Sequence, residues 1–264
     1  AWSRARRRDV KRGAMAGGSA AAAAADDYRT AGFIDTAARS DKATNPANER
    51  RKVIKTFVLL GDLVLAAALA LRGPETARGA VVIANATVFV LRLWVQIWVF
   101  WERRVSWTEV LGEAFFIIPL SLGSLGWGAS EARADDPFLA GESRHLDMVG
   151  QALFVVGTLL IAVYEGQRHL FKRRPENQGK LYSGGLAGAL RCRHLNYFGE
   201  IVSFVGFGLV SGHPLFNQWI PLLMGLGLAV VSVPEIEFYL QRRYAAQWPT
   251  YERGNPYKLI PFVW

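Results

Sequence analysis

The stretch VIKTFVLLGDLVLAAALAL, residues 53–71, decides the fold class of this chain. It is an apolar run of about 20 residues that is interrupted at Asp62, and an α-helix rises 1.5 Å per residue, so the run matches the roughly 30 Å hydrocarbon core of a bilayer. A soluble helix would instead show an apolar stripe beside a polar face. The stretch therefore predicts a membrane-spanning helix.

Further apolar blocks repeat this pattern along the chain, in which 51% of the 264 residues are hydrophobic. They cover residues 80–101, 110–127, 148–164, 201–210 and 219–233. The block at 201–210 is short and needs its flanks to cross a membrane. We expect an all-α, polytopic transmembrane bundle with about six spans, with a basic loop and the C-terminal tail on one side.

Composition divides the chain into three parts. Residues 1–50 form a polar extended arm, residues 51–147 an N-terminal group of membrane helices, and residues 148–264 a C-terminal membrane domain. The formal net charge is +9, and the basic residues lie beside the apolar blocks. This placement favours lipid head groups and a phosphorylated ligand, and it argues against nucleic acid.

The charged loops predict the orientation of the bundle. With six spans, the basic segments at residues 50–52, 168–193 and 242–243 share one side, and the acidic loop at 131–147 lies on the other. Basic loops stay on the cytoplasmic side of most membranes. We therefore expect the N-terminus, the long basic loop and the tail on a cytoplasmic or matrix-like side.

The N-terminal arm raises the question of partners. Its early arginines and its alanine run (Ala20 to Ala25) are similar to part of an organellar targeting segment. An arm with so few core-forming residues cannot offset its conformational entropy alone, so an ordered arm would lie on other subunits of a membrane complex. The alternative is a disordered arm without function. We expect an organellar membrane, with the mitochondrial inner membrane favoured over the endoplasmic reticulum.

Cysteine and metal chemistry are the least supported by the sequence. Cys192 is the single cysteine, which excludes an internal disulfide framework and a CxxC site. The His, Cys, Asp and Glu residues show no metal-ligand spacing, so we expect no metal.

The most informative polar segment runs through residues 165–212 and contains RHLNYFGE at 193–200. Guanidinium groups match phosphate oxygens, and glycines allow close backbone approach. Because polar groups at the start of an apolar helix are costly without partners, the cluster predicts an anionic, nucleotide-like ligand at the membrane face. The alternative is a basic anchor with an interfacial Tyr197.

This segment resembles the C-terminal domain of the steroid 5α-reductase and sterol reductase superfamily. The motif matches at Arg193, His194, Asn196, Tyr197, Gly199 and Glu200, and the resemblance covers roughly residues 150–264. It implies an NADPH-binding domain. By that resemblance, the cofactor-binding residues are Asn177, Lys180, Arg193, His194, Asn196, Tyr197, Glu200, Tyr251 and Lys258.

The resemblance also implies reduction of a carbon–carbon double bond in a lipid, which needs a proton donor. Steroid 5α-reductases take a Glu and a Tyr from the early helices, yet this chain has no tyrosine between Tyr28 and Tyr164. The candidate catalytic acids are Glu109 and Glu113, which are four residues apart and share a helix face. The alternative is that these carboxylates, together with Asp62, pair with Arg92.

Two functions follow from these patterns. The first is an NADPH-dependent membrane reductase acting on a sterol- or isoprenoid-like lipid. The alternative is a catalytically degenerate accessory subunit of a large organellar membrane complex, possibly respiratory, that holds a lipid or dinucleotide structurally.

Overall fold

A computed structural model describes residues 46–72, 76–101, 118–131, 138–139, 144–213 and 215–264 of the chain. Glu109, Glu113 and the N-terminal arm up to residue 45 lie outside these residues.

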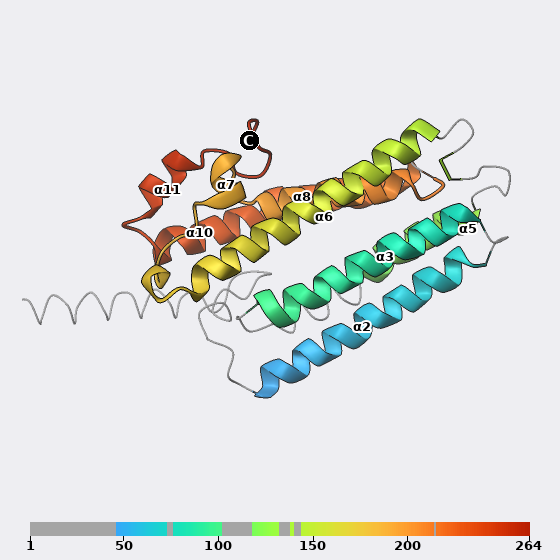
Figure 1. Ribbon diagram of the computed structural model, residues 1–264, viewed down its shortest axis with the longest axis horizontal. Coiled ribbons are helices and arrows are strands. Elements are labelled where there is room, and N and C mark those ends of the chain that lie inside the picture. Colours follow the sequence, from blue (N-terminus) through green and yellow to red (C-terminus); the bar gives the residue numbers. More distant parts are fainter. Residues whose placement is uncertain (1–45, 73–75, 102–117, 132–137, 140–143, 214) are drawn as a thin grey trace, which may run out of the picture.

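The described part is helical and contains no β-strand. Its longer helices are α2 (Pro46–Ala70), α3 (Ala77–Val95), α5 (Ile118–Glu131), α6 (Arg144–Arg173), α8 (Leu195–Leu209), α9 (Trp219–Gly227) and α10 (Val233–Arg243). The π-helical turns η2 (Gln96–Phe100) and η6 (Leu228–Ser232) extend α3 and α9, and the short helices are η4 (Pro175–Asn177), α7 (Gly185–Ala189), η5 (Phe216–Gln218) and α11 (Trp248–Gly254). In Figure 1, α2, α3 and α5 form one group, and α6, α8 and α10 form the other.

Four helical segments are long and apolar enough to cross a membrane: Arg50–Ala70, Ala77–Phe100, Arg144–Arg173 and Phe216–Arg243. They correspond to four of the six predicted spans, so the all-α membrane bundle is confirmed. The predicted span at 110–127 begins outside the described residues. Helix α8 has 15 residues, or about 22 Å at 1.5 Å per residue, and is shorter than the hydrocarbon core. The number of spans stays a prediction.

Helix α6 continues past the predicted end of its span at residue 164 as far as Arg173. An ion pair between Glu165 and Arg168, one turn apart, stabilises this extension, with 3.0 Å between Oε2 and the guanidinium. The helix ends before Pro175, because the residue before a proline is pushed out of the α conformation. Part of the predicted basic loop is therefore helix.

The helices alternate in direction, as the charge pattern predicts. The start of α2, the end of α6 and the end of α10 lie toward the same end of the bundle, and α7 and α11 lie near the end of α10 (Figure 1). That end holds basic residues such as Arg173, Arg191, Arg242 and Arg243. Which side of the membrane it faces stays a prediction.

Glycines let α6 and α8 touch along their backbones. Gly150 and Gly157 on α6 face Gly199 and Gly206 on α8. Within each helix the two glycines are seven residues apart. A Cβ on Gly157 would lie 2.4 Å from the backbone nitrogen of Ser203, and one on Gly206 would lie 2.3 Å from that of Phe154. Small residues allow such close packing of membrane helices. This contact fixes the position of α8 and of the motif at its start.

Helix α3 contacts α6 and α8 through a stripe of polar residues. Arg78, Asn85 and Arg92 are seven residues apart, so they lie on one face. Arg78 binds both oxygens of Asp147 on α6, at 2.6 and 3.0 Å. Asn85 exchanges two hydrogen bonds with Gln151, at 3.0 and 3.2 Å. The sequence pattern places Asp147 in the acidic loop, but its side chain is fully buried and paired with Arg78.

The glycine contact gives a matched test of packing. We expect Gly157→Ala to destabilise the protein by about 1–3 kcal/mol, because the new methyl group meets rigid backbone. Gly166 lies on the same helix, and nothing lies within 4 Å of a Cβ placed on it. Gly166→Ala should therefore leave the melting temperature in detergent unchanged or raise it slightly. Equal melting temperatures for the two variants would contradict the close α6–α8 contact.

Candidate functional site

The motif at the start of α8 is bound to the C-terminal tail through the backbone. Arg193 N–H donates to the carbonyl of Tyr257 at 2.9 Å, and His194 N–H donates to that of Lys258 at 3.0 Å. The N–H of Tyr257 donates in turn to the carbonyl of Arg191 at 3.2 Å. The tail therefore fixes the position of the residues directly before the helix begins at Leu195.

The side chain of Arg193 has protein partners on α10 and the tail. Its Nε lies 2.6 Å from Oε1 of Glu237, and its guanidinium donates to the carbonyl of Asn255 at 2.8 Å. The guanidinium also stacks over Trp248, and only 3% of the residue is exposed. The Nε2 atom of His194 lies 3.4 Å from the same Glu237 oxygen. In this structure the guanidinium predicted to hold a phosphate joins α8 to α10.

The next motif residues turn toward α6. Asn196 donates to Oε1 of Glu165 at 3.1 Å, and Arg168 holds the other oxygen of that carboxylate. The ring of Tyr197 stacks on His194, with 5.8 Å between centroids. Glu165 is buried, and it is a site residue that the sequence pattern does not predict. The sequence feature that could have identified Glu165 is its position directly after the apolar block at 148–164, where a charged side chain needs a partner.

Glu200 connects the motif to the N-terminal helices. Both of its oxygens accept from Arg92 of α3, each at 2.7 Å. The alternative expectation that Arg92 pairs with Asp62 is wrong, because the carboxylate that Arg92 binds among the described residues is Glu200. Pairing with Glu109 or Glu113 stays a prediction. Asp62 is buried in α2, and its Oδ2 has no hydrogen-bond partner among the described residues.

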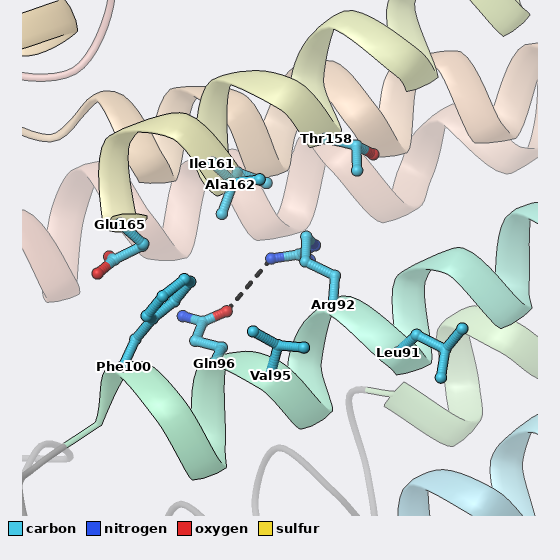
Figure 2. Close-up of a pocket in the computed structure, with 9 residues that line it drawn as sticks. All are labelled: Leu91, Arg92, Val95, Gln96, Phe100, Thr158, Ile161, Ala162 and Glu165. Atoms are coloured by element: carbon cyan, nitrogen blue, oxygen red, sulfur yellow. Dashed lines mark hydrogen bonds between the residues drawn. The ribbon is translucent and has the colours of Figure 1, made fainter. Parts of the chain in front are cut away.

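A pocket of about 240 Å³ lies beside these contacts, between α3 with η2 and α6 (Figure 2). It is lined by Leu91, Arg92, Val95, Gln96, Phe100, Thr158, Ile161, Ala162 and Glu165. Arg92 donates to Oε1 of Gln96 at 3.3 Å. Two residues that line the pocket, Arg92 and Glu165, contact the motif residues Glu200 and Asn196. The pocket thus lies one side chain away from the predicted cofactor motif.

The other predicted cofactor residues lie at the same end of the bundle. Asn177 caps the end of α6 by donating to the carbonyl of Phe171 at 3.1 Å. Lys180 is exposed, and the ammonium of Lys258 lies 3.9 Å from Oε2 of Glu237. Tyr251 is buried, and burial raises the pKa of its hydroxyl.

Gln247 joins the loop after α6 to the segment before α11. It donates to the carbonyl of Gly179 at 2.8 Å and accepts from the N–H of Leu181 at 3.0 Å. The structure therefore brings the predicted cofactor residues of the loop after α6, Asn177 and Lys180, to the same end as those of α11 and the tail, Tyr251 and Lys258. Their role in binding stays a prediction. In the part of the chain that the structure describes, no three His, Cys, Asp or Glu side chains gather as metal ligands do.

The last helices and the tail thus enclose the Arg-His-x-Asn-Tyr cluster at residues 193–197. Residues 127–254 match the family described as "Protein of unknown function (DUF1295)", a steroid 5α-reductase-like family. The resemblance predicted from the motif is confirmed for the C-terminal half of the chain.

Two curated proteins are similar to parts of the chain. The chain is 32% identical to "Probable O-methyltransferase ustE" of Ustilaginoidea virens over 135 residues, which is 51% of this chain and 44% of that protein. It is 22% identical to "Delta(14)-sterol reductase" of Arabidopsis thaliana over 180 residues, which is 63% of this chain and 46% of that protein. The chain therefore spans less than half the length of these relatives.

The tail contact predicts a protected cysteine. Cys192 is fully buried, and its thiol lies 3.3 Å from the carbonyl oxygen of Leu259. Burial raises the pKa of this thiol from 9.0 to about 11. Because the thiolate is the reactive form, we expect alkylation by a maleimide at pH 8 to be about 100-fold slower than in the unfolded chain. Labelling followed by mass spectrometry measures this, and rapid labelling of the folded protein would contradict the tail's position.

The contact between Arg92 and Glu200 can be tested by a double-mutant cycle. Arg92→Gln leaves the Glu200 carboxylate buried without its cation, which should cost about 3–5 kcal/mol of stability. Adding Glu200→Gln removes that charge and should recover most of the loss. Unfolding in detergent, followed by tryptophan fluorescence, gives the four stabilities. Additive losses would show that the two side chains do not interact.

Proposed function

We propose that this protein is an NADPH-dependent membrane reductase of carbon–carbon double bonds in a lipid. One observation carries the proposal. Asn196 and Glu200 of the motif bind Glu165 and Arg92, and these two residues line a pocket between membrane helices. A dinucleotide held by the motif and a lipid held by the pocket would lie close enough to react. The similarity to a protein named Delta(14)-sterol reductase supports this reaction class.

The side chains around the motif are of the types that bind the phosphates, ribose and base of a dinucleotide. The Nε and NH1 groups of Arg193 donate to protein acceptors and the residue is buried, so the phosphates would fall to the more exposed cations Arg191 and Lys258. The half-buried Asn196 and Tyr197 offer an amide and a ring for ribose or base. When bound, NADPH would supply the hydride.

The chain's own residues would position the lipid and exclude water. The apolar walls of the pocket keep bulk solvent from the reacting atoms, and the Arg92–Glu200 pair keeps the pocket at a fixed distance from the motif. The proton donor stays predicted at Glu109 or Glu113, outside the described residues. The proposal also places the protein in an organellar membrane, with the mitochondrial inner membrane favoured.

A second candidate is methyl transfer to an oxygen atom. It is favoured by the 32% identity to a protein named as a probable O-methyltransferase. The two reactions differ in product, because reduction adds two hydrogens to the lipid and methyl transfer adds one carbon. Mass spectrometry of lipids incubated with the protein and either NADPH or S-adenosylmethionine separates them. The accessory-subunit alternative predicts neither product, together with comigration with a large complex in mild detergent.

Cofactor binding tests the first candidate directly. Lys258→Ala should weaken NADPH binding about tenfold, as loss of one charge-assisted hydrogen bond does. Arg253→Ala, on α11, removes an exposed cation outside the predicted site and should change the affinity less than about twofold. The fluorescence of NADPH on titration with purified protein measures both. Absence of binding by the unmodified protein would overturn the proposal.

A further inference from the structure

The surface at the motif end of the bundle carries an apolar cluster in residues 259–264, here called the tail turn. In the described surface segments at this end, 174–194 and 244–264, the exposed large apolar side chains all belong to the tail turn. They are Ile260, Phe262, Val263 and Trp264, with Phe262 62% and Val263 75% exposed. Apolar side chains left in water cost free energy in proportion to their area, and clusters of them mark interaction surfaces. The tail turn therefore needs a cover.

Backbone hydrogen bonds hold the tail turn in one shape. The carbonyl of Trp264 accepts from the N–H groups of Leu259 and Ile260, each at 2.8 Å, and the N–H of Trp264 donates to the carbonyl of Ile260 at 3.0 Å. Phe262 has a φ of 64°, in the left-handed region, which is unfavourable for a residue with a bulky side chain. Such strain persists only where the surrounding structure imposes it. The turn thus presents Phe262 as part of a fixed apolar surface.

The tail turn begins level with the membrane helices and not beyond their ends. Tyr257 and Lys258, directly before it, accept backbone hydrogen bonds from the two residues that precede α8. At the start of α8, Asn196 contacts Glu165 of α6, and α6 continues from there to Arg173, over about 12 Å at 1.5 Å per residue. Figure 1 shows the C-terminal end beside the start of α8, set back along the bundle from the ends of α6 and α10. Because the apolar block of α6 ends next to Glu165, the turn lies at the depth where hydrocarbon meets head groups.

The side chains of the tail turn and its neighbour Lys258 are those of a membrane-interface anchor. Tryptophan is enriched at the level of the head groups, because its ring is apolar and its N–H is polar. A lysine beside it can lie along apolar surface and keep its ammonium in the polar layer. Here the ammonium of Lys258 lies 6.0 Å from the ring centroid of Trp264, and the lysine side chain is 43% exposed. Phe262 and Val263 add uncharged apolar area, so acyl chains suit this surface better than water does.

We propose that the tail turn inserts into the interface of the bilayer that the helices cross, where lipid acyl chains cover Phe262 and Val263. The carbonyls of Tyr257 and Lys258 fix the residues before α8, so the bilayer then supports the position of the motif through the tail. Insertion requires neither a bound dinucleotide nor a lipid substrate, and it goes beyond the proposed function.

Spin labelling of introduced cysteines, with the protein in lipid nanodiscs, tests the insertion. A nitroxide on the Val263→Cys variant should collide readily with molecular oxygen, which concentrates in the bilayer, and should lose most collisions with a water-soluble nickel chelate. The Ile260→Cys variant should give the same result, so the test does not depend on one position. Cys192 is buried, so the label reacts with the introduced cysteine.

Two control positions set the scale of the collision rates. Leu159→Cys places the label within the membrane span of α6, at a side chain that is 55% exposed, and should favour oxygen. Glu176→Cys places it in η4, on the exposed surface after α6, and should favour the nickel chelate. If the label at Val263 collides with nickel as the one at Glu176 does, the tail turn lies in water. If neither reagent reaches it, protein covers the turn. Either result would overturn the proposal.

Discussion

The bidentate contact between Arg92 and Glu200 is the interaction on which the arrangement of the two helix groups depends. A guanidinium and a carboxylate inside a bilayer are costly apart, so each fixes where the other can lie. Arg92 comes from α3 and Glu200 from α8, and both oxygens are bound at 2.7 Å. With the contacts of Arg78 and Asn85, it sets α3 in one rotation relative to the C-terminal helices.

The C-terminal domain meets this contact as a rigid unit. Glycines bring α8 against α6, and the tail holds the residues before α8 by backbone hydrogen bonds. Arg193 then joins α8 to α10 through Glu237. The same motif therefore has two structural faces, one toward the tail at the membrane surface and one toward the pocket.

Local signals in the sequence predicted most of the fold. Apolar blocks predicted about six spans, four of which correspond to long apolar helices in the described residues, and a run of motif residues predicted the family that the C-terminal half matches. The partner of Arg92 and the place of Glu165 were missed because ion pairs depend on how distant helices pack, which residue spacing does not encode. The extension of α6 was missed because the segment after residue 164 is too polar for a span. Glu109 and Glu113 stay predictions.

The charge balance of the stripe has a consequence for an energised membrane. Moving one elementary charge across a membrane with a voltage of 100 mV changes its free energy by about 2.3 kcal/mol. An ion pair whose two charges lie at one depth has no net charge, so the voltage does no net work when the pair moves as a unit. Arg78 with Asp147 and Arg92 with Glu200 are two such pairs. Helix α3 therefore carries two guanidinium groups through the bilayer, and the electric field exerts no net force on either pair.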